Sequence, residues 1–131
     1  MEKGVELICD IPYPKCIIYS EKNRLIQVLS NLLSNAAKFT EQGSITMGYR
    51  IIDSGLSFYV TDTGKGIEKE NLSQIFERFM KFDSFVPGTG LGLSICQLIV
   101  HKLNGHIMVD SEPGKGSTFS FTIACDPKPV I

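Results

Sequence analysis

The chain has 131 residues, enough to bury the core of one domain and too few for two. Hydrophobic residues make up 43% of it and its formal net charge at pH 7 is −1, so a folded globular domain is expected rather than a disordered chain. Charges of both signs are mixed and no basic run occurs, which argues against nucleic acid or an anionic membrane surface as the main partner. The apolar stretches are too short and too broken for a transmembrane helix or a signal peptide.

Strands and helices are interspersed along the chain. In the first half of the chain, periodicity and turn residues predict strands at 5–9 and 16–19, a helix at 23–38 that Gln42-Gly43 ends, and strands at 44–52 and 56–61. In the second half they predict a partial helix at 68–76, a loop at 80–90, a helix at 91–103, strands at 106–111 and 117–124, and a trailing tail from 126. Asp53-Ser54-Gly55 has hairpin-turn composition. This arrangement predicts an α/β (α+β) two-layer sandwich, with one mixed, mainly antiparallel sheet of about five strands and about three helices on one face.

The predicted helix at 23–38 has two different faces. A core stripe is expected from the apolar residues at helical spacing, Leu25, Val28, Leu29, Leu32 and Ala36. Asn31, Asn35 and Lys38 share another face, because they lie at i, i+4 and i+7. Two amide oxygens one turn apart can bind a hard cation such as Mg²⁺, and the lysine adds a charge directed at phosphate. A solvated polar face is the alternative, and the motifs that follow favour the binding site.

Asp62 ends an apolar strand and precedes a turn that contains Gly64 and Gly66. An aspartate in this position is usually a turn former. At the edge of an apolar pocket, however, its carboxylate would accept a hydrogen bond from the amino group of adenine, where guanine carries a carbonyl. The two glycines would let the backbone approach the base closely. The pattern therefore predicts selectivity for adenine over guanine.

Two further glycine turns follow. Gly88-Thr89-Gly90-Leu91-Gly92 leads into a predicted helix, and a helix N-terminus supplies amide donors and a positive dipole end that suit phosphate. A surface loop is the alternative for this segment, whose spacing is neither a dinucleotide fingerprint nor a P-loop. Gly114-Lys115-Gly116-Ser117-Thr118 precedes the last long strand. The Thr118 hydroxyl is predicted to lie next to Asp62, where it would share a water or the base edge.

These blocks resemble, in order, the N, G1, G2 and G3 boxes of the sensor histidine kinase catalytic domain. That domain belongs to the ATP-binding superfamily that includes DNA gyrase, the Hsp90 chaperone and MutL. The blocks are Asn31-Leu-Leu-Ser-Asn35-Ala-Ala-Lys38-Phe39, Asp62-Thr-Gly64-Lys-Gly66-Ile67, Gly88-Thr-Gly90-Leu-Gly92-Leu93 and Gly114-Lys-Gly116-Ser117-Thr118-Phe119, and Ile75-Phe76-Glu77-Arg78-Phe79 matches the F box. The resemblance covers about residues 21–122. Each box alone is weakly specific, but five boxes in order are highly specific, and together they imply the Bergerat fold with ATP and Mg²⁺ as cofactors.

The resemblance also implies residue roles. Asn35 is expected to ligate magnesium with support from Asn31, while Lys38 contacts phosphate and Phe39 packs on adenine. Asp62 is expected to bind the adenine amino group. The other expected nucleotide contacts are Gly64, Gly66, Ile67, Phe76, Arg78, Lys81, Gly88, Thr89, Gly90, Leu91, Gly92 and Thr118. Arg78 and Lys81 would approach the phosphates from the side of the ATP lid, a loop expected at 80–89.

The resemblance favours the kinase branch of the superfamily. Hydrolysing relatives place a glutamate base where this chain has Asn31, an amide that cannot activate water, so ATP is expected to be held for transfer. Histidine kinases carry the phosphoacceptor on a separate dimerisation domain, and only 30 residues precede Asn31 here. His101 and His106 are expected to be structural. We therefore interpret residues 1–131 as a single catalytic domain without its phosphoacceptor domain, monomeric on its own and incompetent for autophosphorylation.

The expected partners follow from this interpretation. They are the dimerisation domain of the parent kinase and, downstream, the receiver domain of a response regulator, with no nucleic acid and no direct membrane contact. A reducing cytoplasm is the expected location, because the four cysteines lie in apolar runs without zinc-site spacing and are predicted to be buried thiols. Two alternatives stay open. One is a serine kinase of the anti-sigma-factor type, and the other is a nucleotide-gated interaction module without catalysis.

Overall fold

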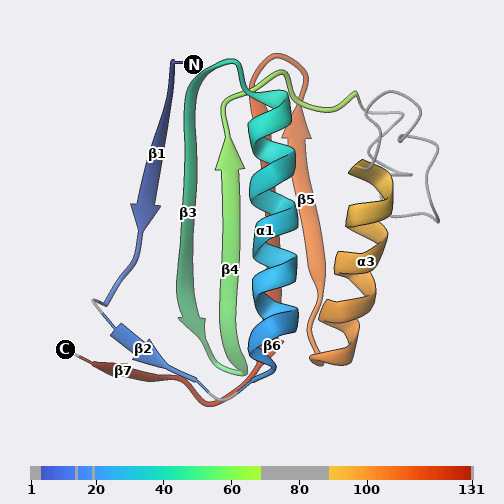
Figure 1. Ribbon diagram of the computed structural model, residues 1–131. Helices are drawn as coiled ribbons and strands as arrows, with labels where there is room; N and C mark the ends of the chain where they lie inside the picture. Colours follow the sequence, from blue (N-terminus) through green and yellow to red (C-terminus); the bar gives the residue numbers. More distant parts are fainter. Residues whose placement is uncertain (1–3, 14, 19, 69–88, 131) are drawn as a thin grey trace.

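In the described part of the chain the fold has two layers, a five-stranded sheet and two helices that cover one of its faces (Figure 1). The structure is a computed structural model, and it describes residues 4–13, 15–18, 20–68 and 89–130. The strand order β1-β3-β4-β6-β5 is formed by β1 (Gly4–Asp10), β3 (Gln42–Ile52), β4 (Gly55–Asp62), β6 (Gly116–Ala124) and β5 (Ile107–Glu112). β1 runs parallel to β3 and every other pair is antiparallel. The predicted mixed, mainly antiparallel sandwich is confirmed.

The helices within the described part of the chain are α1 (Lys22–Phe39) and α3 (Thr89–Lys102). The third helix, expected within 68–76, lies outside the described residues from 69 onward, as does most of the loop expected at 80–90. One predicted helix end is wrong. α1 ends at Phe39, Thr40 is already extended, and Gln42-Gly43 begins β3 instead of ending the helix.

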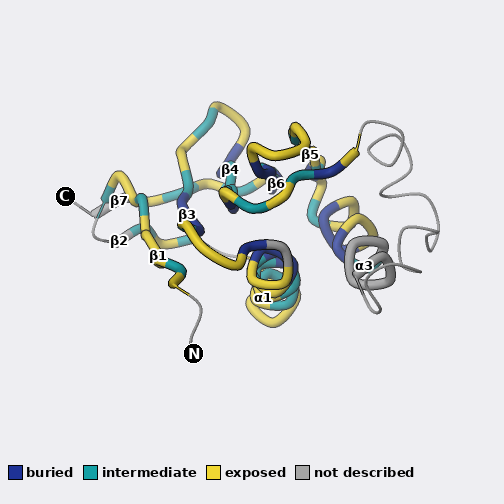
Figure 2. Tube along the Cα trace, turned by 90° about the horizontal axis from the view of Figure 1, so that it is seen from above, coloured by how far each residue is buried: buried dark blue, intermediate teal, exposed yellow. Residues whose placement is uncertain are grey.

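The hydrophobic core lies between the helices and the sheet. From α1 it receives Val28, Leu32 and Ala36, with Leu25 and Leu29 packed against them, so the predicted core stripe is confirmed. The sheet contributes alternate residues of β4 and β6, chiefly Val60, Phe119, Phe121 and Ile123. Each large side chain buried in this way contributes roughly 1.5–3 kcal/mol of transfer free energy. Figure 2 shows the buried segments where α1 and α3 face the strands.

The core face of α3 is formed by Cys96, Ile99 and Val100, which are buried, whereas Leu98 is 64% exposed. The buried positions follow the i, i+3, i+4 rule, and residue 98 lies about 100° around the helix from residue 99 and about 160° from residues 96 and 100. The cysteine prediction needs correction, because Cys96 is the buried thiol while Cys9 is exposed.

The tail does not trail away as predicted. β2 (Lys15–Ile17) and β7 (Lys128–Val130) pair antiparallel into a separate two-stranded sheet. Pro129 stands opposite Cys16, a position that a proline tolerates in so short an edge pairing. Neither described helix is both long and apolar enough to cross a membrane.

Candidate functional site

The polar side of α1 carries Asn31, Asn35 and Lys38, which we call the amide face. Asn35 is only 5% exposed, and its Nδ2 is buried without a hydrogen-bond partner among the described residues. Asn31 is half-buried and donates from Nδ2 to Cys96 Sγ at 3.6 Å, while Lys38 is exposed. Phe39 is the last residue of α1, and its side chain lies outside the description. The amide face therefore contains a buried donor that the described protein itself does not satisfy.

Asp62 is the last residue of β4 and is 3% exposed. Its Oδ1 accepts a hydrogen bond from the backbone N–H of Gly64 at 2.8 Å. Burial raises the pKa of this carboxyl, while the N–H groups of Gly64 and Ser117 and the nearby Thr40 hydroxyl act to lower it. The Thr40 hydroxyl is near the carboxylate but does not reach hydrogen-bond geometry with a described residue. Asp62 is thus a desolvated carboxylate with one anchored oxygen, suited to accept a hydrogen bond from a polar ligand.

The loop after Asp62 and the turn before β6 are joined by one serine. Ser111 Oγ accepts from the N–H of Ile67 at 2.9 Å and lies 2.9 Å from the carbonyl oxygen of Gly116 and 2.8 Å from Ser117 Oγ. All three contacts are satisfied if Ser111 donates its hydroxyl hydrogen to the carbonyl and accepts from the Ile67 N–H and from the Ser117 hydroxyl. We call Lys65–Ile67, Ser111 and Gly114–Ser117 the turn cluster.

Two glycines of the turn cluster are sterically required. Gly66 has a φ of 76°, and a Cβ there would lie 2.1 Å from the carbonyl oxygen of Glu112. Gly116 has a φ of 111°, and its Cβ would lie 2.0 Å from the carbonyl oxygen of Asp62. Any side chain would force the two turns apart, so the glycines allow the close approach that brings the loop against the turn.

Thr118 does not stand directly opposite Asp62, and its expected contact with a nucleotide stays a prediction. In the β4–β6 register Asp62 stands opposite Ser117, and Thr118 stands opposite Thr61, with their hydroxyl oxygens 3.0 Å apart. Successive strand residues face opposite sides of a sheet, so Ser117 shares the core face with Asp62 while Thr118 faces away from the helices. Sequence reasoning missed Ser117, Ser111 and Thr40. A signal existed for Ser117, since Phe119, Phe121 and Ile123 alternate and extend the same face back to it.

The remaining predicted residues divide into two groups. Thr89, Gly90, Leu91 and Gly92 form the first residues of α3, so the helix begins earlier than residue 91 and includes glycines predicted to precede it. The first N–H groups of a helix lack intrahelical partners and carry its positive dipole end. Phe76, Arg78, Lys81 and Gly88 lie outside the described residues.

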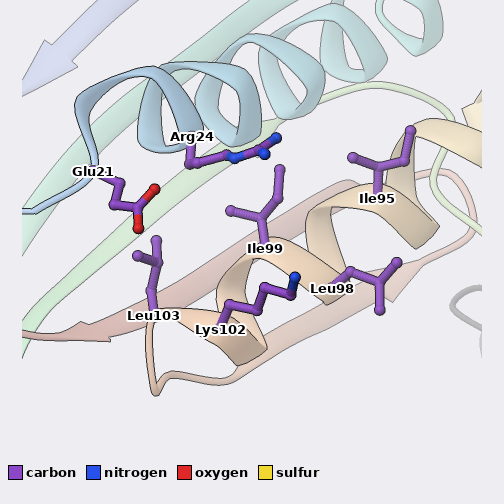
Figure 3. A pocket seen from close by; sticks show the side chains of 7 residues that line it. All are labelled: Glu21, Arg24, Ile95, Leu98, Ile99, Lys102 and Leu103. Atoms are coloured by element: carbon purple, nitrogen blue, oxygen red, sulfur yellow. The ribbon is translucent and has the colours of Figure 1, made fainter.

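Two cavities border the helices and the turn cluster. The larger, of about 300 Å³, lies between the start of α1 and the end of α3, where Glu21 and Arg24 face Ile99 and Leu103 (Figure 3). Its described lining contains none of the predicted site residues. The smaller, of about 250 Å³, is bordered by Asp62 and Ser117. Asp62 and Ser117 are both buried polar residues. The polar character of its lining, rather than its volume, therefore makes the second cavity part of the candidate site.

The residues of the amide face fit a hard cation held together with phosphate oxygens. Within the described ranges no three His, Cys, Asp or Glu residues are grouped so that they could bind a metal ion. The amide oxygens of Asn31 and Asn35 are hard ligands of the type Mg²⁺ prefers, and Mg²⁺ is commonly bound by few protein groups plus substrate phosphates. The buried Asn35 nitrogen would then find its acceptor in a phosphate oxygen.

Comparison with known proteins decides the family. Residues 20–127 match the family of histidine kinase-, DNA gyrase B- and HSP90-like ATPases. The chain belongs to this ATPase family. It is 41% identical over 134 residues to hybrid signal transduction histidine kinase B of Dictyostelium discoideum and 41% identical over 128 residues to sensor histidine kinase RcsC of Escherichia coli. These matches cover 95% and 94% of the chain but only 7% and 14% of the two relatives, so the chain corresponds to a small part of each.

Solved structures agree with this assignment. Full-length ShkA in complex with AMPPNP superposes with a TM-score of 0.84 at 34% identity, over 97% of this chain and 27% of that one. The mycobacterial sensor histidine kinase MprB gives a TM-score of 0.78 at 27% identity, over 96% of this chain and 84% of that one. The predicted resemblance to the histidine kinase catalytic domain is confirmed, and the ATPase-family fold supports ATP binding.

Proposed function

We propose that the chain binds Mg-ATP and holds its γ-phosphoryl group for transfer to a histidine of a separate dimerisation domain in two-component signal transduction. The observation that carries this proposal is the buried Asn35 amide nitrogen, which has no partner in the part of the chain that the structure describes. Leaving such a donor unsatisfied costs about 1–3 kcal/mol, which a helix tolerates where a ligand completes the hydrogen bond. A bound nucleotide phosphate would supply the missing acceptor, so the energetic cost in the free protein would favour binding.

The candidate site residues that the structure describes have distinct roles in the proposed reaction. The free oxygen lone pairs of Asp62 would accept the adenine amino group while Gly64 anchors the carboxylate. Asn31 and Asn35 would bind the cation and phosphate, and the N-terminal amides of α3 would line the phosphates. Bound Mg²⁺ would supply charge neutralisation at the phosphates. Catalysis would then consist of positioning and electrostatic stabilisation.

Asn31 would also determine the fate of the phosphoryl group. A side-chain amide has no basic site for a water proton, so water bound nearby would not be activated. ATP would persist until an acceptor histidine arrives. The acceptor domain, and beyond it a receiver domain, are the partners this function needs. The similarity to histidine kinases favours them over the serine-kinase alternative.

Calorimetric titration with ATP and with GTP, each with and without Mg²⁺, tests the binding step. Micromolar binding that requires adenine and is strengthened by Mg²⁺ is expected. Transfer is then tested by adding a dimerisation domain from a related kinase and asking whether the phosphate formed is acid-labile, as phosphohistidine is and phosphoserine is not. Absence of ATP binding would contradict the proposal at its first step, and an acid-stable product would contradict the histidine acceptor.

A further inference from the structure

A buried thiol connects the amide face to α3. Cys96 is 0% exposed, and its Sγ accepts from Asn31 Nδ2 at 3.6 Å and lies 3.9 Å from the carbonyl oxygen of Val28. Val28 and Asn31 are three residues apart on α1, so the thiol sits against a single turn of that helix. Asn31 is a residue that the proposed function uses, so its contact with Cys96 links the proposed cation site to α3.

The chemistry of the thiol fixes which end of the amide it meets. A thiol has one hydrogen and a weakly accepting sulfur, and a carbonyl oxygen can only accept. The Cys96 hydrogen therefore points to Val28, and the sulfur is left to accept from the amide nitrogen of Asn31. The amide nitrogen of Asn31 is thus directed toward α3.

We propose that Cys96 is a positioning residue that orients the Asn31 amide for cation binding. The nitrogen and oxygen diverge from one carbon atom, so a nitrogen held at Cys96 makes the oxygen point away from it. The terminal torsion of a side-chain amide is broad and nearly two-fold, so loss of the thiol would remove a contact that favours this orientation over the flipped one. This inference rests on the proposed function, because only there does the direction of the Asn31 oxygen matter.

Cys96 also connects the Asn31 amide with the N-terminus of α3, the two parts of the proposed site. α3 begins at Thr89–Gly92, the segment expected to line the phosphates, and Cys96 lies one to two turns further along the same helix. A shift of α3 along its axis would move the sulfur relative to Asn31. The orientation of the cation ligand therefore depends on the placement of the helix whose N-terminus would meet the phosphates.

Three variants test this role by the Mg²⁺ dependence of ATP affinity, measured by calorimetry with Mg²⁺ and with EDTA. Cys96→Val removes both polar functions, and it should reduce the strengthening by Mg²⁺ roughly 2- to 10-fold, the range for one neutral hydrogen bond, while affinity in EDTA stays unchanged. Cys96→Ser keeps a donor and an acceptor and should restore the wild-type ratio. Ile99→Val alters the same buried face of α3 without a polar contact, and it should leave the ratio unchanged.

A readout without nucleotide separates this inference from the proposed function. The side-chain amide protons of Asn31 should exchange slowly in the wild type and in Cys96→Ser, and faster in Cys96→Val, as seen by nuclear magnetic resonance. If the wild type binds no ATP, the proposed function fails, and this exchange measurement still decides whether Cys96 holds the amide. Unchanged Mg²⁺ dependence and unchanged exchange in Cys96→Val, or in Cys96→Ala should the valine variant not fold, would overturn the positioning role.

Discussion

The turn cluster and the amide face, the two parts of the proposed nucleotide site, differ in how their polar groups are satisfied. In the turn cluster, Ser111 bonds to three neighbours at 2.8–2.9 Å, and the N–H of Gly114 bonds to the carbonyl of Lys65 at 2.7 Å. The amide face consists of side chains from a single helix. Asn31 is directed by a weak bond to sulfur, and Asn35 buries a nitrogen with no partner among the described residues.

The difference shows where rigidity and where unsatisfied bonding are useful. A fixed backbone surface suits a planar, rigid base, because its shape is set before binding and little entropy is lost. Phosphates and a cation demand ligands whose bonds form only in the complex. The unsatisfied donor therefore lowers the stability of the free protein by about 1–3 kcal/mol and favours the bound form by the same interaction. The proposed base site would then combine the Asp62 carboxylate with a fixed backbone surface, and the proposed phosphate site would combine the Asn31 and Asn35 side chains with the N-terminal amides of α3.

The largest effect should come from breaking the turn cluster. Gly66→Ala places a Cβ 2.1 Å from the Glu112 carbonyl oxygen at a φ of 76°, and it should lower the free energy of unfolding by about 3 kcal/mol. Gly114 is the matched control, because its φ is 80° but a Cβ there has nothing within 4 Å. Gly114→Ala should cost only about 1 kcal/mol. Equal losses in urea unfolding would show that the contact between the turns is not tight.

Asp62→Asn should weaken ATP binding about 10- to 100-fold, as expected for a hydrogen bond to a charged group. The carboxylate has two acceptor oxygens, one of which the Gly64 N–H occupies. An asparagine offers a single acceptor, so either the turn or the base loses its bond. Asp53→Asn removes the same charge from the hairpin turn at the opposite end of β4 from Asp62, and calorimetry should show wild-type affinity for it. Wild-type affinity in Asp62→Asn would remove Asp62 from base recognition.

The sequence predicted most of the fold because the relevant signals are local. The apolar stripe of α1 and the hairpin turn at Asp53–Gly55 depend on neighbouring residues, and both are confirmed. The β2–β7 pairing was missed because the strands are three residues long and their partners lie more than 100 residues apart. Pairings between such distant segments depend on tertiary packing and leave little local pattern.

The site shows the same division. Asn31 and Asn35 could be placed on one face from helical periodicity alone, whereas the neighbour of Asp62 depends on strand register. The register of β4 on β6 places Ser117 directly opposite Asp62, which the sequence pattern alone did not predict. The contact between Asn31 and Cys96 joins positions 65 residues apart, and it follows only from the packing of α1 on α3.

Asn35→Ala tests the amide face. Unlike Gly66→Ala, it should raise the free energy of unfolding. Removing a buried unsatisfied donor and a poor helix former should raise the free energy of unfolding by about 1 kcal/mol. ATP affinity in Mg²⁺ should fall roughly tenfold in the same variant. Ser34→Ala, at the exposed neighbouring position, should give only the smaller gain of helix propensity and unchanged affinity. A loss of stability in Asn35→Ala would mean that the amide is satisfied in the free protein.

The smallest effect is a pH dependence of opposite sign for two aspartates. Burial raises the pKa of Asp62 above its ordinary value of 3.8, so its stabilising contribution is complete below the unfolded-state pKa and is lost as pH rises through the folded-state pKa. The pKa of Asp10 is lowered, first by a hydrogen bond from the Tyr59 hydroxyl and then by one from Arg50. The contribution of Asp10 to stability is therefore present above the unfolded-state pKa and is lost as pH falls through the folded-state pKa.

Urea unfolding between about pH 3 and pH 7 should separate the two groups. Relative to the wild type, Asp62→Asn should become more stable as pH rises, and Asp10→Asn should become less stable over the same interval. The slope with pH is the readout, because it cancels any pH-independent effect of either substitution on packing. Slopes of the same sign would mean that Asp62 is solvated like a surface carboxylate. The desolvated acceptor proposed for adenine would then be absent, and the proposed role of Asp62 in base recognition would fail.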